Sequence, residues 1–269
     1  MSDENDFTHL AWNLNAELWD EKMGTEGNDF FRVLQLPYIL DYLKSYPVNG
    51  DAPIHILDIA CGNGLLSRKL AELGYKVTAI DFSENLIERA KAYQNPSNLI
   101  QYQVIDVSDP SSLQQLDDAV YDHAICNMAL FDIASIEPIF EFLRKKIKPG
   151  GTFIFSLLHP VFNNSSTIKS VEEIYENEGL KEVFSVKISK YLSIYAAKGI
   201  ALSGQKHPQY YFNRPIEYYL NLGFQNGFVV DRFNETSFKE QETKNTLSWG
   251  SNFHEIPPVL MVRMKKMER

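Results

Sequence analysis

The stretch Leu57-Asp-Ile-Ala-Cys-Gly-Asn-Gly-Leu-Leu66 decides the fold of this 269-residue chain. It begins in an apolar strand, passes through a tight turn with two glycines and opens into a helix over 65–73, which Gly74 stops. Gly62 and Gly64 can adopt a positive φ and let a ligand approach the backbone closely. Because the first N–H groups of a helix have no partner within it, this turn is predicted to bind a ligand.

Strand and helix patterns alternate from residue 54 onward. This βαβα order predicts an α/β fold with a doubly wound, mostly parallel sheet. In such a sheet the ligand lies outside the carboxyl ends of the strands. The expected strands are 54–59, 75–80, 100–105, 123–126 and 152–158, and the expected helices are 65–73, 84–93 and 133–147.

Two segments depart from this alternation. Residues 1–50 carry Trp12, Trp19 and two phenylalanines at mainly helical spacing, which predicts a helical N-terminal cap. Residues 161–212 mix polar, helical and aromatic pieces and are predicted to be an insertion after the fifth strand, covering the substrate site of a domain that spans 51–269. The pattern ends with an expected helix over 215–222 and expected strands over 227–233 and 259–265.

Three successive strands end in an acid, namely Asp58, Asp81 and Asp106. A dinucleotide-binding loop holds a pyrophosphate at the helix N-terminus, but Asp58 would repel that group, and Ser67 stands where the third glycine of the dinucleotide fingerprint belongs. A positively charged, phosphate-free nucleoside such as S-adenosylmethionine suits these acids better. We expect Asp58 to face its ammonium group, Asp81 its ribose hydroxyls and Asp106 its adenine amino group.

These motifs resemble those of a known family. Leu57-Asp-Ile-Ala-Cys-Gly-Asn-Gly64, Ala79-Ile-Asp-Phe-Ser83 and Val104-Ile-Asp-Val107 look like the first three motifs of the class I S-adenosylmethionine-dependent methyltransferases. Lys148-Pro-Gly-Gly-Thr152 is similar to the turn before the fifth strand in that family. The resemblance covers about residues 54–160. It implies a Rossmann-like sheet of seven strands, the last one antiparallel and inserted between the fifth and the sixth.

The C-terminal part resembles small-molecule members of the same family. The similar stretches are Tyr211-Phe-Asn-Arg-Pro-Ile-Glu-Tyr218, Gly223-Phe224 and Ile256-Pro-Pro-Val-Leu260. Those members often place histidine where this chain has Asn213. The resemblance therefore implies methyl transfer from S-adenosylmethionine to a small molecule by in-line displacement, in which the protein aligns the reactants and excludes water.

The candidate site residues follow from these positions. His159, directly after the fifth strand, is a candidate general base because the pKa of an unperturbed histidine suits that task, with a loop histidine bonded to backbone as the alternative. Tyr211 and Arg214 could line the acceptor pocket, with helix-entry packing and a surface ion pair as the alternatives. The predicted cofactor-binding residues are Asp58, Ala60, Cys61, Gly62, Gly64, Asp81, Phe82, Asp106, Val107, Asn127 and Met128.

Charge and composition limit the other functions. The net charge of −9 argues against a nucleic-acid partner, and Asn127 matches only the first position of the Asn/Asp-Pro-Pro-aromatic motif of enzymes that methylate base amino groups. Apolar runs such as 153–158 are too short to span a bilayer, so we expect a cytoplasmic protein without a membrane partner. No metal site can be assembled from the acids present. The alternatives are an NAD(P)-dependent oxidoreductase, a non-catalytic S-adenosylmethionine-binding protein and an RNA methyltransferase.

Overall fold

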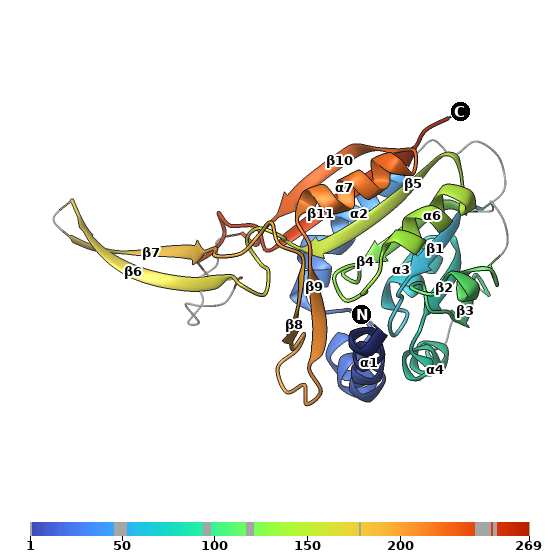
Figure 1. Cartoon of the computed structure of the whole chain (residues 1–269), viewed down its shortest axis with the longest axis horizontal. Coiled ribbons are helices and arrows are strands. Elements are labelled where there is room, and N and C mark those ends of the chain that lie inside the picture. The colour runs from blue at the N-terminus through green and yellow to red at the C-terminus, as the bar shows by residue number, and fades with distance from the viewer. Residues whose placement is uncertain are drawn as a thin grey trace.

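A seven-stranded sheet forms the centre of the molecule (Figure 1). The computed structural model describes residues 2–45, 53–93, 98–116, 121–177, 179–239, 249 and 252–268. The strand order is β10-β11-β5-β4-β1-β2-β3, in which β11 runs antiparallel to both of its neighbours while β1 to β5 are parallel. The predicted α/β fold and the inserted antiparallel strand are therefore confirmed. The strands are β1 (His55–Ile59), β2 (Lys76–Asp81), β3 (Ile100–Val104), β4 (Tyr121–Asn127), β5 (Ile147–Leu158), β10 (Phe228–Thr236) and β11 (Val259–Lys266).

The sheet is buried on both faces because its central strands are apolar at nearly every position. Successive side chains of a strand point to opposite faces, so Phe153 and Phe155 pack in one core while Ile154 between them packs in the other. The first core includes residues of α6 (Glu137–Lys146) and α7 (Ile216–Gln225). The second includes residues of α2 (Leu36–Lys44), α3 (Leu65–Glu72) and α4 (Glu84–Ala92).

The N-terminal segment is helical, as predicted, and its parts lie in different places. Helix α1 (Ser2–Met23) lies at the carboxyl ends of the parallel strands, next to α4 (Figure 1). The π-helical turn η1 (Phe30–Gln35) leads into α2, whose Ile39 and Tyr42 are buried in the core. The division of the chain into a cap and a domain at residue 50 stays a prediction, and residues 46–50 lie outside the described residues.

The insertion after β5 consists of two β-hairpins. They are β6 (Ile168–Glu176) with β7 (Gly179–Lys187), and β8 (Tyr195–Gly199) with β9 (Gln209–Asn213). The first hairpin projects away from the sheet, whereas the second lies next to α1 (Figure 1). The expectation of helical pieces here was wrong for the described residues 161–177 and 179–212. Aromatic residues such as Tyr195, Tyr210 and Phe212 lie in strands, and Gln209 and Phe212 of β9 are buried.

Some element boundaries differ from those expected for local reasons. The helix expected over 133–147 begins at Glu137, so Pro138 lies in its first turn, where a missing N–H costs no hydrogen bond. A short helix, α5 (Pro110–Leu113), was not predicted; it begins after Asp109, whose carboxylate accepts hydrogen bonds from the Ser111 and Ser112 N–H groups. Within the described part of the chain, no helix has the length and apolar character needed to cross a membrane.

Candidate functional site

A cavity of about 560 Å³ opens at the carboxyl ends of the parallel strands. The sheet side of its wall includes most of the predicted cofactor-binding residues, and α1 and the β8–β9 hairpin supply the opposite side. This volume lies in the range of small-molecule and cofactor sites. The predicted residues on its wall are Ala60, Gly62, Asp81, Phe82, Asp106, Val107, Asn127 and Met128.

The turn after β1 is held in a conformation that favours glycine. Gly62 has a φ of 57° and Gly64 a φ of 72°. A Cβ on Gly64 would come within 2.5 Å of the Tyr102 hydroxyl, so a larger residue is excluded by packing as well as by φ. The Cys61 N–H donates to the Ile80 carbonyl at 2.9 Å, which ties the turn to β2.

Asp58 lies behind this turn instead of on the cavity wall. It is 1% exposed, and its Oδ2 accepts a hydrogen bond of 2.5 Å from the Ser67 hydroxyl in α3. Burial raises the pKa of the Asp58 carboxyl to about 7, against the lowering effect of the Ser67 hydrogen bond. The expected contact with an ammonium group is therefore corrected, because the strand places Asp58 where it anchors the first turn of α3. Cys61 and Gly64, also predicted to bind the cofactor, shape the turn without lining the cavity.

Asp81, at the end of β2, does line the cavity. Its carboxylate accepts hydrogen bonds from the Gly62 N–H at 2.8 Å and from the Ser83 N–H at 2.9 Å. Burial raises the pKa of Asp81 to about 6, against the lowering effect of these two N–H groups. Each carboxylate oxygen accepts more than one hydrogen bond, so a fixed acceptor faces the cavity.

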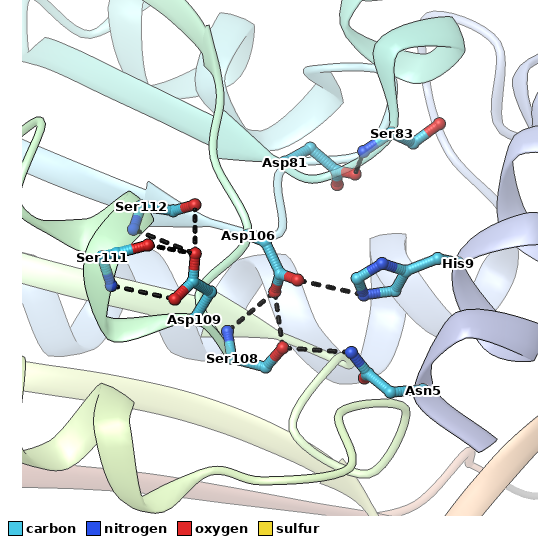
Figure 2. Close-up of polar contacts among 9 residues, drawn as sticks. All are labelled: Asn5, His9, Asp81, Ser83, Asp106, Ser108, Asp109, Ser111 and Ser112. Atoms are coloured by element: carbon cyan, nitrogen blue, oxygen red, sulfur yellow. Dashed lines mark hydrogen bonds and ion pairs between the residues drawn. The ribbon is translucent and has the colours of Figure 1, made fainter. Parts of the chain in front are cut away.

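Asp106, after β3, contacts helix α1 (Figure 2). Its Oδ1 accepts from the Ser108 N–H at 2.8 Å, and its Oδ2 lies 3.5 Å from the His9 Nε2. The His9 ring is also stacked on Phe82, with ring centroids 4.0 Å apart. Asn5, one helical turn before His9, donates to the Ser108 hydroxyl at 3.2 Å. An adenine cannot lie between His9 and Phe82 unless the His9 ring moves.

Helix α1 is fixed to the sheet side at further points. The Ser83 hydroxyl donates to the Asn13 side chain at 2.6 Å. The carboxylate of Asp20 accepts from the Asn63 amide at 2.9 Å and from the Tyr93 hydroxyl at 2.8 Å. The contacts of Asn5, His9 and Asn13 were not expected from the sequence, whereas Trp12 and Trp19, noted there, also line the cavity. The helical spacing of these residues does not reveal which surface the helix covers.

Comparison with known proteins identifies the central part of this chain. Residues 57–155 match the family described as "Methyltransferase domain". The ubiquinone biosynthesis O-methyltransferase of Rickettsia bellii is 32% identical over 128 residues, which cover 47% of this chain and 50% of that protein. The chain thus spans about half the length of the curated relatives it matches.

Solved structures share the fold. An S-adenosylmethionine-dependent methyltransferase from Mesorhizobium loti superposes with a TM-score of 0.64 at 21% identity, over 81% of this chain and 94% of that one. The glycopeptide N-methyltransferase MtfA complexed with S-adenosyl-L-methionine superposes with a TM-score of 0.54 at 14% identity, over 91% of this chain and 99% of that one. Residues 57–155 thus match a methyltransferase domain, and the chain shares the fold of S-adenosylmethionine-dependent methyltransferases.

His159 occupies a different place from the one expected. It is 1% exposed and does not line the cavity. Its Nδ1 accepts from the Val161 and Phe162 N–H groups at 3.2 and 3.3 Å, so its Nε2 donates to Glu235 Oε1 at 2.9 Å. Burial lowers the pKa of His159, against the raising effect of Glu235. The geometry thus favours the alternative of a loop histidine, which stabilises the turn after β5.

A second group of residues lines the cavity from the loop after β4 and from β9. Tyr211 from β9 packs on Phe131 from the loop after β4, with ring centroids 5.7 Å apart. Arg214 lines the cavity, is 5% exposed and donates through its guanidinium to backbone carbonyls, so among the described residues it is a buried group and not part of a surface ion pair. Phe131 and Asp132, both on the cavity wall, were not predicted from the sequence. Their position directly after the fourth strand could have indicated them, because ligands lie at the carboxyl ends of the strands.

Proposed function

We propose that the protein transfers a methyl group from S-adenosylmethionine to a small-molecule acceptor. One observation carries this proposal, namely that two kinds of wall belong to the same cavity. On one side lie the strand ends that carry Asp81 and Asp106, which suit a nucleoside. On the other side lie aromatic and amide side chains from the loop after β4 and from the β8–β9 hairpin. Methyl transfer needs both reactants in one enclosed space, since the sulfonium is already a good leaving group and alignment is the main requirement.

The residues on the sheet side fit the proposed cofactor. The backbone at Gly62 reaches the cavity with no side chain between, and its N–H orients Asp81. From that position Asp81 would accept from the ribose hydroxyls. Val107 offers apolar surface for an adenine, and Phe82 would do so once the His9 ring moves away from it, while Asn127 and Met128 line the wall after β4. When bound, the cofactor would supply the methyl group as an electrophile, and these residues would fix its orientation.

Three observations favour a small acceptor over a nucleic acid. The cavity volume of about 560 Å³ suits small ligands, and the net charge of −9 opposes binding to a phosphate backbone. The curated relatives are named for ubiquinone biosynthesis, which supports a small-molecule acceptor here. Salt-dependent binding of RNA would contradict this part of the proposal.

Two measurements test the function. S-adenosylhomocysteine should raise the melting temperature of the protein whereas NAD should not, which separates methyl transfer from a nicotinamide-dependent reaction. Labelled S-adenosylmethionine, offered with a panel of phenols, alcohols and amines, should then yield a labelled product. A shift with NAD but not with S-adenosylhomocysteine would overturn the proposal, and tight cofactor binding without any turnover would support a non-catalytic binding protein.

A further inference from the structure

One carboxyl on the cavity wall has an oxygen without a protein partner. Asp132 lies in the loop after β4 and lines the cavity, and its Oδ1 is buried without a hydrogen-bond partner. The described part of the chain has a few other buried side-chain polar atoms without a hydrogen-bond partner, but their residues do not line the cavity. A buried polar atom without a partner costs free energy, which a ligand with a hydrogen-bond donor would recover.

The loop holds Asp132 firmly in this position. The Asp132 N–H donates to the Ala129 carbonyl at 2.8 Å, and the Phe212 N–H donates to the Phe131 carbonyl at 2.7 Å. The buried guanidinium of Arg214 donates to carbonyls on both sides of Asp132, those of Leu130, Ile133 and Ala134. The backbone that carries the carboxyl is therefore fixed before any ligand arrives.

Other polar side chains at this end of the cavity already have partners. The Asn213 Oδ1 accepts from the Ser165 N–H, and its Nδ2 donates to the Ser165 hydroxyl. The Asn164 Oδ1 accepts from the Ser166 N–H, and its Nδ2 donates to the Pro160 carbonyl. Arg214 is committed to backbone carbonyls. These groups are bound to one another or to backbone, whereas the Oδ1 of Asp132 is not.

The surroundings of Asp132 are mainly aromatic. Phe131, Tyr211 and Tyr219 all line the same cavity. Burial raises the pKa of the Asp132 carboxyl well above its usual range. Burial also raises the pKa of Tyr211, and the negative charge of Asp132 raises it further, which places that phenol near the carboxyl. Burial raises the pKa of Tyr219 to about 12, against the lowering effect of the Arg214 guanidinium, which donates to backbone carbonyls.

We propose that Asp132 selects the methyl acceptor by accepting a hydrogen bond at Oδ1 from a hydroxyl group carried on an aromatic ring. The proposal rests on the proposed function, since it names the substrate class of the same cavity. An acceptor without a hydrogen-bond donor leaves Oδ1 unpaired. The ring itself packs among the aromatic residues around the carboxyl.

A matched pair of probes tests this proposal. Phenol and anisole have the same ring, but only phenol has an O–H donor. With S-adenosylhomocysteine bound, the parent protein should bind phenol about tenfold more tightly than anisole, as measured by calorimetry or ligand-observed NMR. Equal affinity for the two, or no binding of either, overturns the proposal; the comparison within the parent does not depend on any variant.

The variant Asp132→Leu should bind S-adenosylhomocysteine as the parent does and lose the preference for phenol. Glu217→Leu, at an exposed acid in the first turn of α7, is the control and should keep it. Asp132→Leu should also unfold at no lower a temperature than the parent, because no protein partner is lost; a marked destabilisation would indicate a structural role and contradict the proposal. If the parent protein itself does not bind S-adenosylhomocysteine, that result would instead count against the proposed function.

Discussion

At the scale of single residues, Gly64 combines two constraints that can be separated. Its φ of 72° disfavours any side chain, and a Cβ there would also come within 2.5 Å of the Tyr102 hydroxyl. Gly74 has a φ of 87° with nothing within 4 Å of the same position. We predict that Gly64→Ala lowers the free energy of unfolding by about 1–2 kcal/mol more than Gly74→Ala does, as measured by urea unfolding. Equal losses would show that packing on Tyr102 is unimportant.

The buried acid Asp58 gives a second prediction at this scale. Its pKa, raised to about 7 by burial, exceeds that of an aspartate in the unfolded chain, so the folded state binds more protons between these two values. The stability that this group contributes is present below about pH 4 and is lost as the pH rises to about 7. The free energy of unfolding of Asp58→Asn, relative to the parent, should therefore increase with pH across this window. A constant difference between the two proteins would contradict it.

The predicted residues that line the cavity depend on local sequence. Asp81 and Gly62 were identified because a strand end and a tight turn place them at the ligand edge wherever the strand packs. His9 and Asp132 could not be assigned, because their roles depend on contacts between segments far apart in the chain. Asp58 was misplaced for a related reason: strand alternation and the packing of α3 decide which side of the turn it faces, and Ser67 lies there.

At the scale of elements, α1 covers the nucleoside end of the cavity through a few side chains. His9 stacks on Phe82 and lies 3.5 Å from Asp106, both partly exposed, so this contact contributes at most about 1 kcal/mol. We predict that His9→Ala increases amide hydrogen exchange within residues 2–23 of the ligand-free protein. The exposed Leu10→Ala on the same helix is the control and should leave exchange near the parent level. Similar exchange in both variants would mean that the stack does not hold α1.

The order of elements was predictable, whereas the arrangement of the insertion was not. The sheet followed from alternating apolar runs and, for its strand order, from the family resemblance. The hairpins of residues 161–212 pair polar and aromatic strands whose register is set by their partners, and such strands carry a weak local signal. Sequence patterns therefore predict the cavity residues at the strand ends more reliably than those in the insertion.

At the scale of the whole molecule, the two hairpins differ in their relation to the cavity. The β8–β9 hairpin supplies cavity residues, whereas the described residues 168–177 and 179–187 do not line the cavity. Glu172 and Val183 are cross-strand partners, so the segment between them can be replaced by two glycines without moving the hairpin base. We predict that this shortened protein binds S-adenosylhomocysteine within about twofold of the parent affinity. A loss of binding would place the projecting hairpin within the functional unit.

We expect the carboxyl ends of these strands to bind the nucleoside of S-adenosylmethionine through Asp81. Calorimetric titration of S-adenosylhomocysteine into the parent, Asp81→Ala and Glu84→Ala tests it most directly. Asp81 lies on the cavity wall and accepts hydrogen bonds from two backbone N–H groups, whereas Glu84 is exposed. Asp81→Ala should therefore lose at least about tenfold in affinity, and Glu84→Ala almost none. Unchanged affinity in Asp81→Ala, with the parent binding well, would contradict the account.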